Sequence, residues 1–268
     1  MELKHLNTIL VFKRVVRGIL IYLRTRKINM DFFEKSIIEL QKQRPIFHSE
    51  DDLKLALAFN IKQNNPEFEI RLERPVELEM INRNGKRATV RAPIDIVVID
   101  TNGNAYPIEL KYKTRKVNIS LNNENYILAE HGAQDVGRYS FRKDIYRIEN
   151  YKSKNLNYKY GYVLILTNDN AYFEKNVFEK DNFDKHFSFH NDALLNRFDL
   201  SWNYTKIDKT KFTLNEDNVW YNINSKEHWT CKKDYFYKLD LLKDYEIAWK
   251  DYSIIEKTTF KYCLIKIE

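Results

Sequence analysis

Three charged residues stand within two strongly apolar stretches of this sequence. Asp95 lies inside the apolar run of residues 94–98, and Glu109 and Lys111 flank Leu110. Two facing carboxylates repel each other unless a cation lies between them, and Mg²⁺ prefers carboxylate ligands while keeping several waters. A water on such an ion can attack phosphorus, and a nearby ammonium can orient that water and offset charge in the transition state. The three residues therefore indicate metal-dependent hydrolysis of a phosphate ester.

The turn between the two stretches decides whether the acids meet. A three-residue loop over residues 101–103 places Gly103 where a type I turn with a G1 bulge needs a left-handed residue, and it pairs Asp100 with Asn104. This register puts the two acids directly opposite each other. A two-residue turn made by Asn102 and Gly103 turns one acid to the other face of the sheet instead. The sequence leaves both registers open.

Lys111 follows Glu109 by two positions, so the period of a strand points both side chains to the same face. An ordinary hairpin with a solvated Asp95, Glu109 and Lys111 is the competing interpretation. The apolar residues on both sides of the charged ones favour the catalytic interpretation.

The elements around these residues are read from hydrophobic periodicity. Helices are expected over residues 32–41 and from Ser49, an N-cap with Asp52 as its capping partner. Strands are expected over residues 75–80, 89–99 and 105–112, with a turn at 84–85. Residues 125–150 have a helical pattern, and the apolar run 160–167 predicts a strand buried on both faces. The predicted order is helix, three strands, helix, strand.

This order, with Asp95 and the Glu109-x-Lys111 pattern, resembles the PD-(D/E)XK nuclease superfamily over roughly residues 45 to 170. The proline stands two residues before Asp95 and not next to it. The resemblance implies a restriction-endonuclease-like αβββαβ core, an α/β fold with a central mixed sheet flanked by helices. It also implies that Asp95, Glu109 and the backbone carbonyl of Leu110 bind Mg²⁺ or Mn²⁺, while Lys111 activates or positions water.

The resemblance adds a fourth acid, because many members carry a glutamate on the helix before the three strands. Glu50 is the candidate for a catalytic and metal-binding residue here. Acids in a first helical turn also stabilise the helix through its dipole, which is the alternative explanation of residues 50–52.

On the predicted helix after the strands, Gln134, Arg138 and Arg142 recur every four residues and share one face. The resemblance suggests that this helix borders the site, so these three residues are expected to bind substrate. A salt-bridged, solvated face that includes Asp135 and Asp144 is the alternative.

Composition and charge narrow the classes of partner. The net charge of +7 favours a polyanion, and DNA is expected more than RNA. The two cysteines, Cys231 and Cys263, form no disulfide or CxxC pattern, which favours a reducing cytoplasm. No apolar run is long enough to span a membrane, and a homodimer or protein partner stays open. His186 and His190 lack the further ligands of a zinc site.

Three segments are expected along the 268 residues. Residues 1–29 form a basic amphipathic helical extension, residues 30–200 the nuclease core, and residues 201–268 a β-rich elaboration of the same domain. The expected function is hydrolysis of DNA phosphodiester bonds by an endonuclease in phage defence or DNA processing. The alternatives are an inactive nucleic-acid-binding or assembly module on the same fold, and a membrane-surface protein that uses residues 1–29.

Overall fold

The structure of the protein is a computed structural model, which describes seven segments of the chain. These are residues 31–82, 87–151, 157–175, 188–198, 212–214, 220–222 and 237–268. The expected N-terminal basic helix, the turn at residues 84–85, Cys231 and His186 lie outside the described residues.

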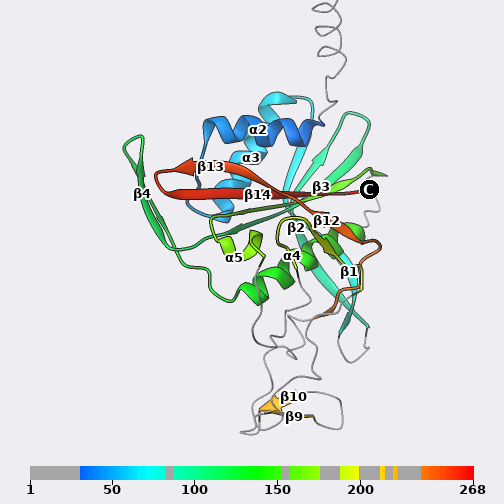
Figure 1. Ribbon diagram of the computed structural model, residues 1–268. Helices are drawn as coiled ribbons and strands as arrows, with labels where there is room; N and C mark the ends of the chain where they lie inside the picture. Colours follow the sequence, from blue (N-terminus) through cyan, green and yellow to red (C-terminus); the bar gives the residue numbers. More distant parts are fainter. Residues whose placement is uncertain are drawn as a thin grey trace, which may run out of the picture.

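A mixed eight-stranded sheet forms the centre of the fold, in the order β11-β1-β2-β3-β7-β14-β13, with β6 paired to β3 (Figure 1). Its strands are β1 (Glu69–Asn82), β2 (Arg87–Ile99), β3 (Asn104–Lys113), β6 (Asn157–Tyr158), β7 (Gly161–Thr167), β11 (Tyr237–Lys238), β13 (Trp249–Ile255) and β14 (Thr258–Ile267). β3 runs parallel to β6 and β7, and the remaining pairs are antiparallel. The expected α/β class with a mixed central sheet is confirmed.

Helices cover both faces of this sheet. Helices α2 (Phe32–Gln43) and α3 (Glu50–Asn64) lie on one side, and α4 (Gln134–Glu149) and α5 (Asn170–Phe173) on the other (Figure 1). Strand β7 shows the layering, since Tyr162 and Leu164 pack with the first pair of helices and Val163 and Ile165 with the second. All seven residues of β7 are buried, as the apolar run predicted.

The N-cap predicted at Ser49 is confirmed. The Ser49 hydroxyl accepts a hydrogen bond from the Asp52 backbone N–H at 3.1 Å, which satisfies one of the free donors of the first turn of α3. This cap fixes the point at which α3 begins. The next residue, Glu50, is thereby placed at the end of the helix that lies nearest to β3.

The single helix expected over residues 125–150 is wrong at its start. Strands β4 (Val117–Leu121) and β5 (Glu124–Leu128) form a hairpin, and α4 begins only at Gln134. The turn residues Asn122 and Asn123 both have positive φ, 52° and 64°, a conformation that asparagine tolerates better than most residues. Their alternating neighbours bury Ile119, Tyr126 and Leu128 against the core, which overrides the helical pattern.

The C-terminal region adds strands to the same sheet. β14 pairs with β7 and β13 pairs with β14, within the region expected to be β-rich. Smaller pairs join β8 (Ala193–Leu195) to β12 (Tyr245–Ile247) and β9 (Phe212–Leu214) to β10 (Trp220–Asn222). Among the described residues, no helix is both long and apolar enough to cross a membrane.

Candidate active site

The β2–β3 turn adopts the register that brings the two acids together. The Asp100 N–H donates to the Asn104 carbonyl and the Gly103 N–H to the Asp100 carbonyl, both at 3.0 Å. Gly103 has a φ of +77°, the left-handed conformation that the three-residue loop requires. The two-residue alternative is thereby excluded.

From this turn the paired ladder runs as far as Ile96 opposite Ile108, so Asp95 and Glu109 stand at the next position in the same register. No pairing between β2 and β3 continues past that point in the described chain. The Leu110 N–H instead donates to Asp95 Oδ2 at 2.8 Å. The Asp95 carboxylate thus satisfies a backbone donor that the separating strands leave open.

Glu109 is the most deeply buried acid of the group, with 0% of its surface exposed. Neither carboxylate oxygen accepts a hydrogen bond, although Oε1 lies 3.1 Å from the Arg147 guanidinium. Burial and the charges of Asp144 and Asp95 raise the pKa of Glu109 well above its usual value, against the opposing effect of Arg147 and Lys111. A buried carboxylate without hydrogen bonds is costly, and such groups are frequent at functional sites.

The pKa of Asp95 is shifted in the opposite direction to that of Glu109. Burial alone raises its pKa, but the Lys111 ammonium and the Leu110 N–H outweigh it and lower the pKa below the usual value, with further contributions from the neighbouring Glu109 and from Lys54. The two opposed acids therefore differ: Asp95 is held ionised, and Glu109 is driven toward its neutral form.

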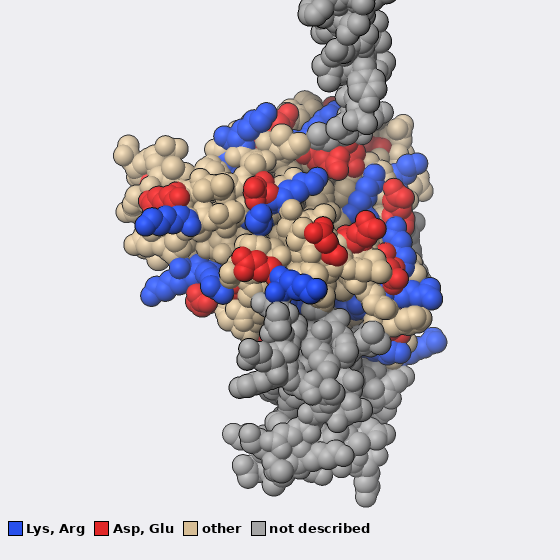
Figure 2. All heavy atoms as spheres, viewed as in Figure 1, with Lys and Arg blue, Asp and Glu red and all other residues tan. Residues whose placement is uncertain are grey.

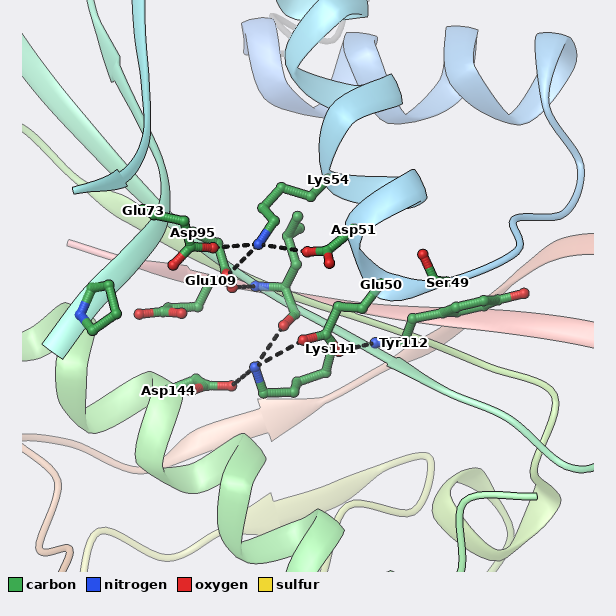
Figure 3. Close-up of polar contacts among 12 residues, drawn as sticks. Ser49, Glu50, Asp51, Lys54, Glu73, Asp95, Glu109, Lys111, Tyr112 and Asp144 are labelled. Carbon is green, nitrogen blue, oxygen red and sulfur yellow. Dashed lines mark hydrogen bonds and ion pairs between the residues drawn. The ribbon is translucent and has the colours of Figure 1, made fainter. Parts of the chain in front are cut away.

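Lys111 lies on the same side as the acids, as predicted. Its Nζ donates to the Leu110 carbonyl at 2.7 Å and lies 3.2 Å from Asp144 Oδ2 and 3.6 Å from Glu50 Oε1 (Figure 3). Burial alone lowers the pKa of Lys111, but the charges of Asp144, Glu50 and the two strand acids raise it well above its usual value. The amine is consequently protonated at neutral pH.

Glu50 joins this group from the first turn of α3. Its Oε2 accepts a hydrogen bond of 2.8 Å from the Tyr112 N–H, two residues beyond the Leu110 N–H on β3. About a third of its side chain, 35%, is exposed, so the carboxylate lies at the opening of the group. Asp95, Glu109, Lys111 and Glu50 are therefore brought together.

Helix α4 supplies two charged residues that the sequence reasoning did not place in the site. Asp144, with 3% of its side chain exposed, pairs with Lys111, and Arg147 pairs with both Glu109 and Asp144. Arg147 also donates to the Pro93 carbonyl. The solvated face that was the alternative interpretation of this helix does not hold for Asp144, which is buried. Its three-residue spacing to Arg147 was the signal for a shared inward face.

Helix α3 and strand β1 supply two further charged residues next to Asp95, namely Lys54 and Glu73. The Lys54 ammonium lies 3.4 Å from Asp95 Oδ1 and 3.0 Å from Asp51 Oδ1, and it also pairs with Glu73 (Figure 3). Lys54 stands four residues after Glu50, which puts both on one face of the helix. The contact of Lys54 with Asp95 spans 41 residues of sequence, so local spacing gave no sign of it.

The expected substrate-binding residues of α4 lie elsewhere. Gln134 Nε2 donates to Asp169 at 3.1 Å, and Arg138 donates to the Ala171 carbonyl at 2.7 Å. Arg142 is 2% exposed and donates to three backbone carbonyls in residues 196–239, each at 2.7 Å. Buried and bonded in this way, the two arginines hold the C-terminal half against α4, and the structure does not bring them to Asp95.

The donor set suits a hard divalent cation. Two carboxylates and a backbone carbonyl are oxygen ligands, and Mg²⁺ commonly takes one or two carboxylates and completes its shell with water. The buried oxygens of Glu109 accept no hydrogen bond, although Oε1 pairs with Arg147, and this fits a cation as their partner. Among the described residues, no group of three or more His, Cys, Asp or Glu side chains is arranged to hold a metal by side chains alone. An ion held here would take the Leu110 carbonyl and water as ligands beside the carboxylates.

Compared with known protein families, curated proteins and solved structures, the chain gives no match. Its charged surface is also mixed, since Lys and Arg alternate with Asp and Glu over the face seen in Figure 2. The buried charged group around Asp95 and Glu109 is thus the strongest pointer to function.

Proposed function

We propose that this chain is a Mg²⁺- or Mn²⁺-dependent nuclease of the PD-(D/E)XK type that hydrolyses DNA phosphodiester bonds. The order of elements supports a restriction-endonuclease-like core, since α3, β1, β2, β3, α4 and β7 follow one another with β7 parallel to β3 and only the β4–β5 hairpin and the short β6 inserted. The observation that carries the proposal is the buried Glu109 carboxylate without hydrogen bonds, opposite Asp95 and beside Lys111.

In this proposal Asp95, Glu109 and the Leu110 carbonyl hold the ion, with Glu50 at the edge of the site. A bound Mg²⁺ supplies a water of lowered pKa and positive charge beside the phosphate. In the hydrolysis, a water oxygen bonds to phosphorus, the bond to a sugar oxygen breaks, and that oxygen takes a proton.

Lys111 acts in the proposed reaction as a charged donor. Its raised pKa keeps the amine protonated, so it cannot accept a proton from water at neutral pH. A protonated amine at this position stabilises negative charge that develops on the phosphate oxygens, and it orients water through its N–H groups.

The test is cleavage of plasmid, single-stranded DNA and RNA with Mg²⁺ or Mn²⁺, comparing wild type with Asp95→Asn, Glu109→Gln and Lys111→Met. Each substitution is nearly isosteric, and we expect each to lower the cleavage rate by about 10²-fold or more. Asp100→Asn, in the turn that follows the strand of Asp95, is the matched control and is expected to cleave at the wild-type rate. Wild-type cleavage by all three site variants would remove the proposal.

A second function is favoured by one observation. Each expected metal ligand already pairs with a cationic side chain of the protein, through Lys54, Arg147 and Lys111. Such neutralisation also suits an inactive nucleic-acid-binding or assembly module on the same fold. That module would bind DNA with a steep salt dependence and show no cleavage with either metal.

A further inference from the structure

Three cationic side chains lie within 3.4 Å of the groups proposed to hold the ion, which are Asp95, Glu109 and the Leu110 carbonyl. Lys54 lies 3.4 Å from Asp95 Oδ1, the Arg147 guanidinium 3.1 Å from Glu109 Oε1, and Lys111 Nζ 2.7 Å from the Leu110 carbonyl. Lys111 belongs to the motif itself, and Arg147 is also held by the Pro93 carbonyl and Asp144. Lys54 differs, because it comes from another helix and carries no motif role.

The Lys54 ammonium has other acidic partners close to Asp95. Besides Asp95, it pairs with Asp51 one turn earlier on α3 and with Glu73 on β1. Both of these carboxylates are more exposed than Asp95, at 85% and 52% against 12% for the side chain. A cation that arrived at Asp95 could leave Lys54 paired to these two acids.

Both carboxylate oxygens of Asp95 already have a polar partner. Its Oδ2 accepts the Leu110 N–H at 2.8 Å, and Lys54 stands on its Oδ1. A divalent ion and an ammonium at the same oxygen repel each other strongly, because neither charge is well screened at a buried site. An ion on Oδ1 therefore requires the ammonium to move away.

Glu73 stands in a conformation consistent with such a role. Leu72 pairs with Ile96 and Arg74 with Ile94, so Glu73 lies at the position opposite Asp95 on the neighbouring strand. Its φ of +51° is left-handed, a rare conformation for a non-glycine residue inside a strand and one that tends to persist where function requires it. The irregularity falls at the one position of β1 that faces Asp95.

We infer that Lys54 is a built-in competitor for the divalent cation: it lies against Asp95 as well as Glu73 and Asp51 in the metal-free protein, and metal binding displaces it from Asp95 so that it keeps only the other two partners. The inference rests on the proposed function, since it takes Asp95 as a metal ligand. It goes further by assigning a regulatory part to two residues outside the motif. Metal affinity is then set by α3 and β1 as well as by the ligands.

The test measures the dissociation constant of Mn²⁺ for the full chain without nucleic acid, from the electron paramagnetic resonance signal of free Mn²⁺. Lys54→Met keeps the length of the side chain and removes its charge, and we expect Mn²⁺ to bind about tenfold more tightly. Lys42→Met removes the same charge at an exposed position on α2 and is expected to stay within about twofold of wild type. Lys54→Gln repeats the test if the methionine variant does not fold.

A double-mutant cycle separates competition from simple charge repulsion. Glu73→Gln removes one of the alternative partners of Lys54, so Lys54 stays on Asp95 and Mn²⁺ binds about threefold more weakly. In the Lys54→Met background the same substitution should change the dissociation constant by less than about 1.5-fold. An equal effect of Glu73→Gln in both backgrounds shows that Glu73 acts on the ion directly and overturns the inference.

Failure of the inference and failure of the proposed function give different results. Cleavage that depends on Asp95, together with Mn²⁺ binding to the Lys54 variants no tighter than to wild type, overturns the inference alone. Tighter Mn²⁺ binding by Lys54→Met and a non-additive cycle, without cleavage by wild type, support the inference and remove the nuclease. Absence of Mn²⁺ binding by both wild type and Lys54→Met overturns the inference.

Discussion

The two ends of the β2–β3 hairpin both carry acids, but the acids are bonded in opposite ways. At the turn, Asp100 accepts hydrogen bonds from the backbone of residues 102 and 104 and from the side chains of Asn104 and Tyr106, at 2.7 to 2.9 Å. At the open end, Glu109 is buried and accepts none. An acid whose oxygens accept several hydrogen bonds stabilises the local conformation of the chain. A buried acid that accepts no hydrogen bond keeps its oxygens available to a ligand.

Two arginines of α4 differ in the same way, one bonded to the backbone and the other to acids of the site. Arg142 donates to three backbone carbonyls, while Arg147 pairs with the carboxylates of Glu109 and Asp144. We expect Arg142→Met to lower the free energy of unfolding by about 3 kcal/mol, because a buried guanidinium is lost and three backbone carbonyls, including that of the buried Leu239, lose their donor. Urea denaturation measures this change.

The control for that substitution is Arg91→Met, at an exposed position of β2, which is expected to change stability by less than about 0.5 kcal/mol. The rate of cleavage per folded molecule should stay unchanged in both variants. A change of substrate affinity in Arg142→Met without loss of stability would return this arginine to the substrate-binding role that the family resemblance suggested.

A smaller effect is expected at the turn. Asp100→Ala removes the acceptor of four hydrogen bonds, and solvent replaces part of them, so we expect a loss of about 1–2 kcal/mol in the free energy of unfolding. Asp100→Asn, which keeps one acceptor oxygen, should lose less. An Asp100→Ala variant as stable as wild type would show that the hydrogen bonds of Asp100 do not stabilise the turn.

The smallest expected effect has the opposite sign. Glu109→Gln removes a buried acid that repels Asp144 and Asp95, and we expect the metal-free protein to gain about 1 kcal/mol at neutral pH. Because the folded pKa of Glu109 is raised, the folded state keeps a proton that the unfolded state loses. Wild-type stability from this group is therefore full at low pH and is lost as pH rises through the folded pKa.

The pH dependence of the two ends should consequently differ. The gain from Glu109→Gln should grow as pH rises from about 4.5 toward 8, and thermal melting of both proteins along that series measures it. The pKa of Asp100 is lowered by its hydrogen bonds despite the opposing effect of burial, so its contribution is lost as pH falls. A stability difference between wild type and Glu109→Gln that stays constant with pH would contradict the raised pKa.

Local chemistry predicted the parts of the site that depend on neighbouring residues. The Ser49 cap predicted the start of α3 and so the place of Glu50. The turn at Gly103 allowed two registers, and the structure adopts the one that sets Asp95 opposite Glu109. The β4–β5 hairpin was missed although its Asn-Asn turn lies between alternating segments.

The remaining residues of the site were set by packing between distant segments. Lys54, Glu73 and Arg147 meet the two strand acids from α3, β1 and α4, and no local pattern specifies those contacts. Regular four-residue spacing pointed to Arg142, but that face of α4 turns toward the carbonyls of the C-terminal half. Helical period identifies which residues share a face, and the tertiary fold decides what the face meets.

The position of β14 has a consequence for the order of events during synthesis. This strand lies inside the sheet, between β7 and β13, and about 90 residues of sequence separate it from β7. A ribosome must therefore deliver residue 267 before β7, the neighbour of the strand that bears Glu109, gains its second partner. Until then one long edge of the sheet stays open, and an open edge of this kind can pair with strands of other chains.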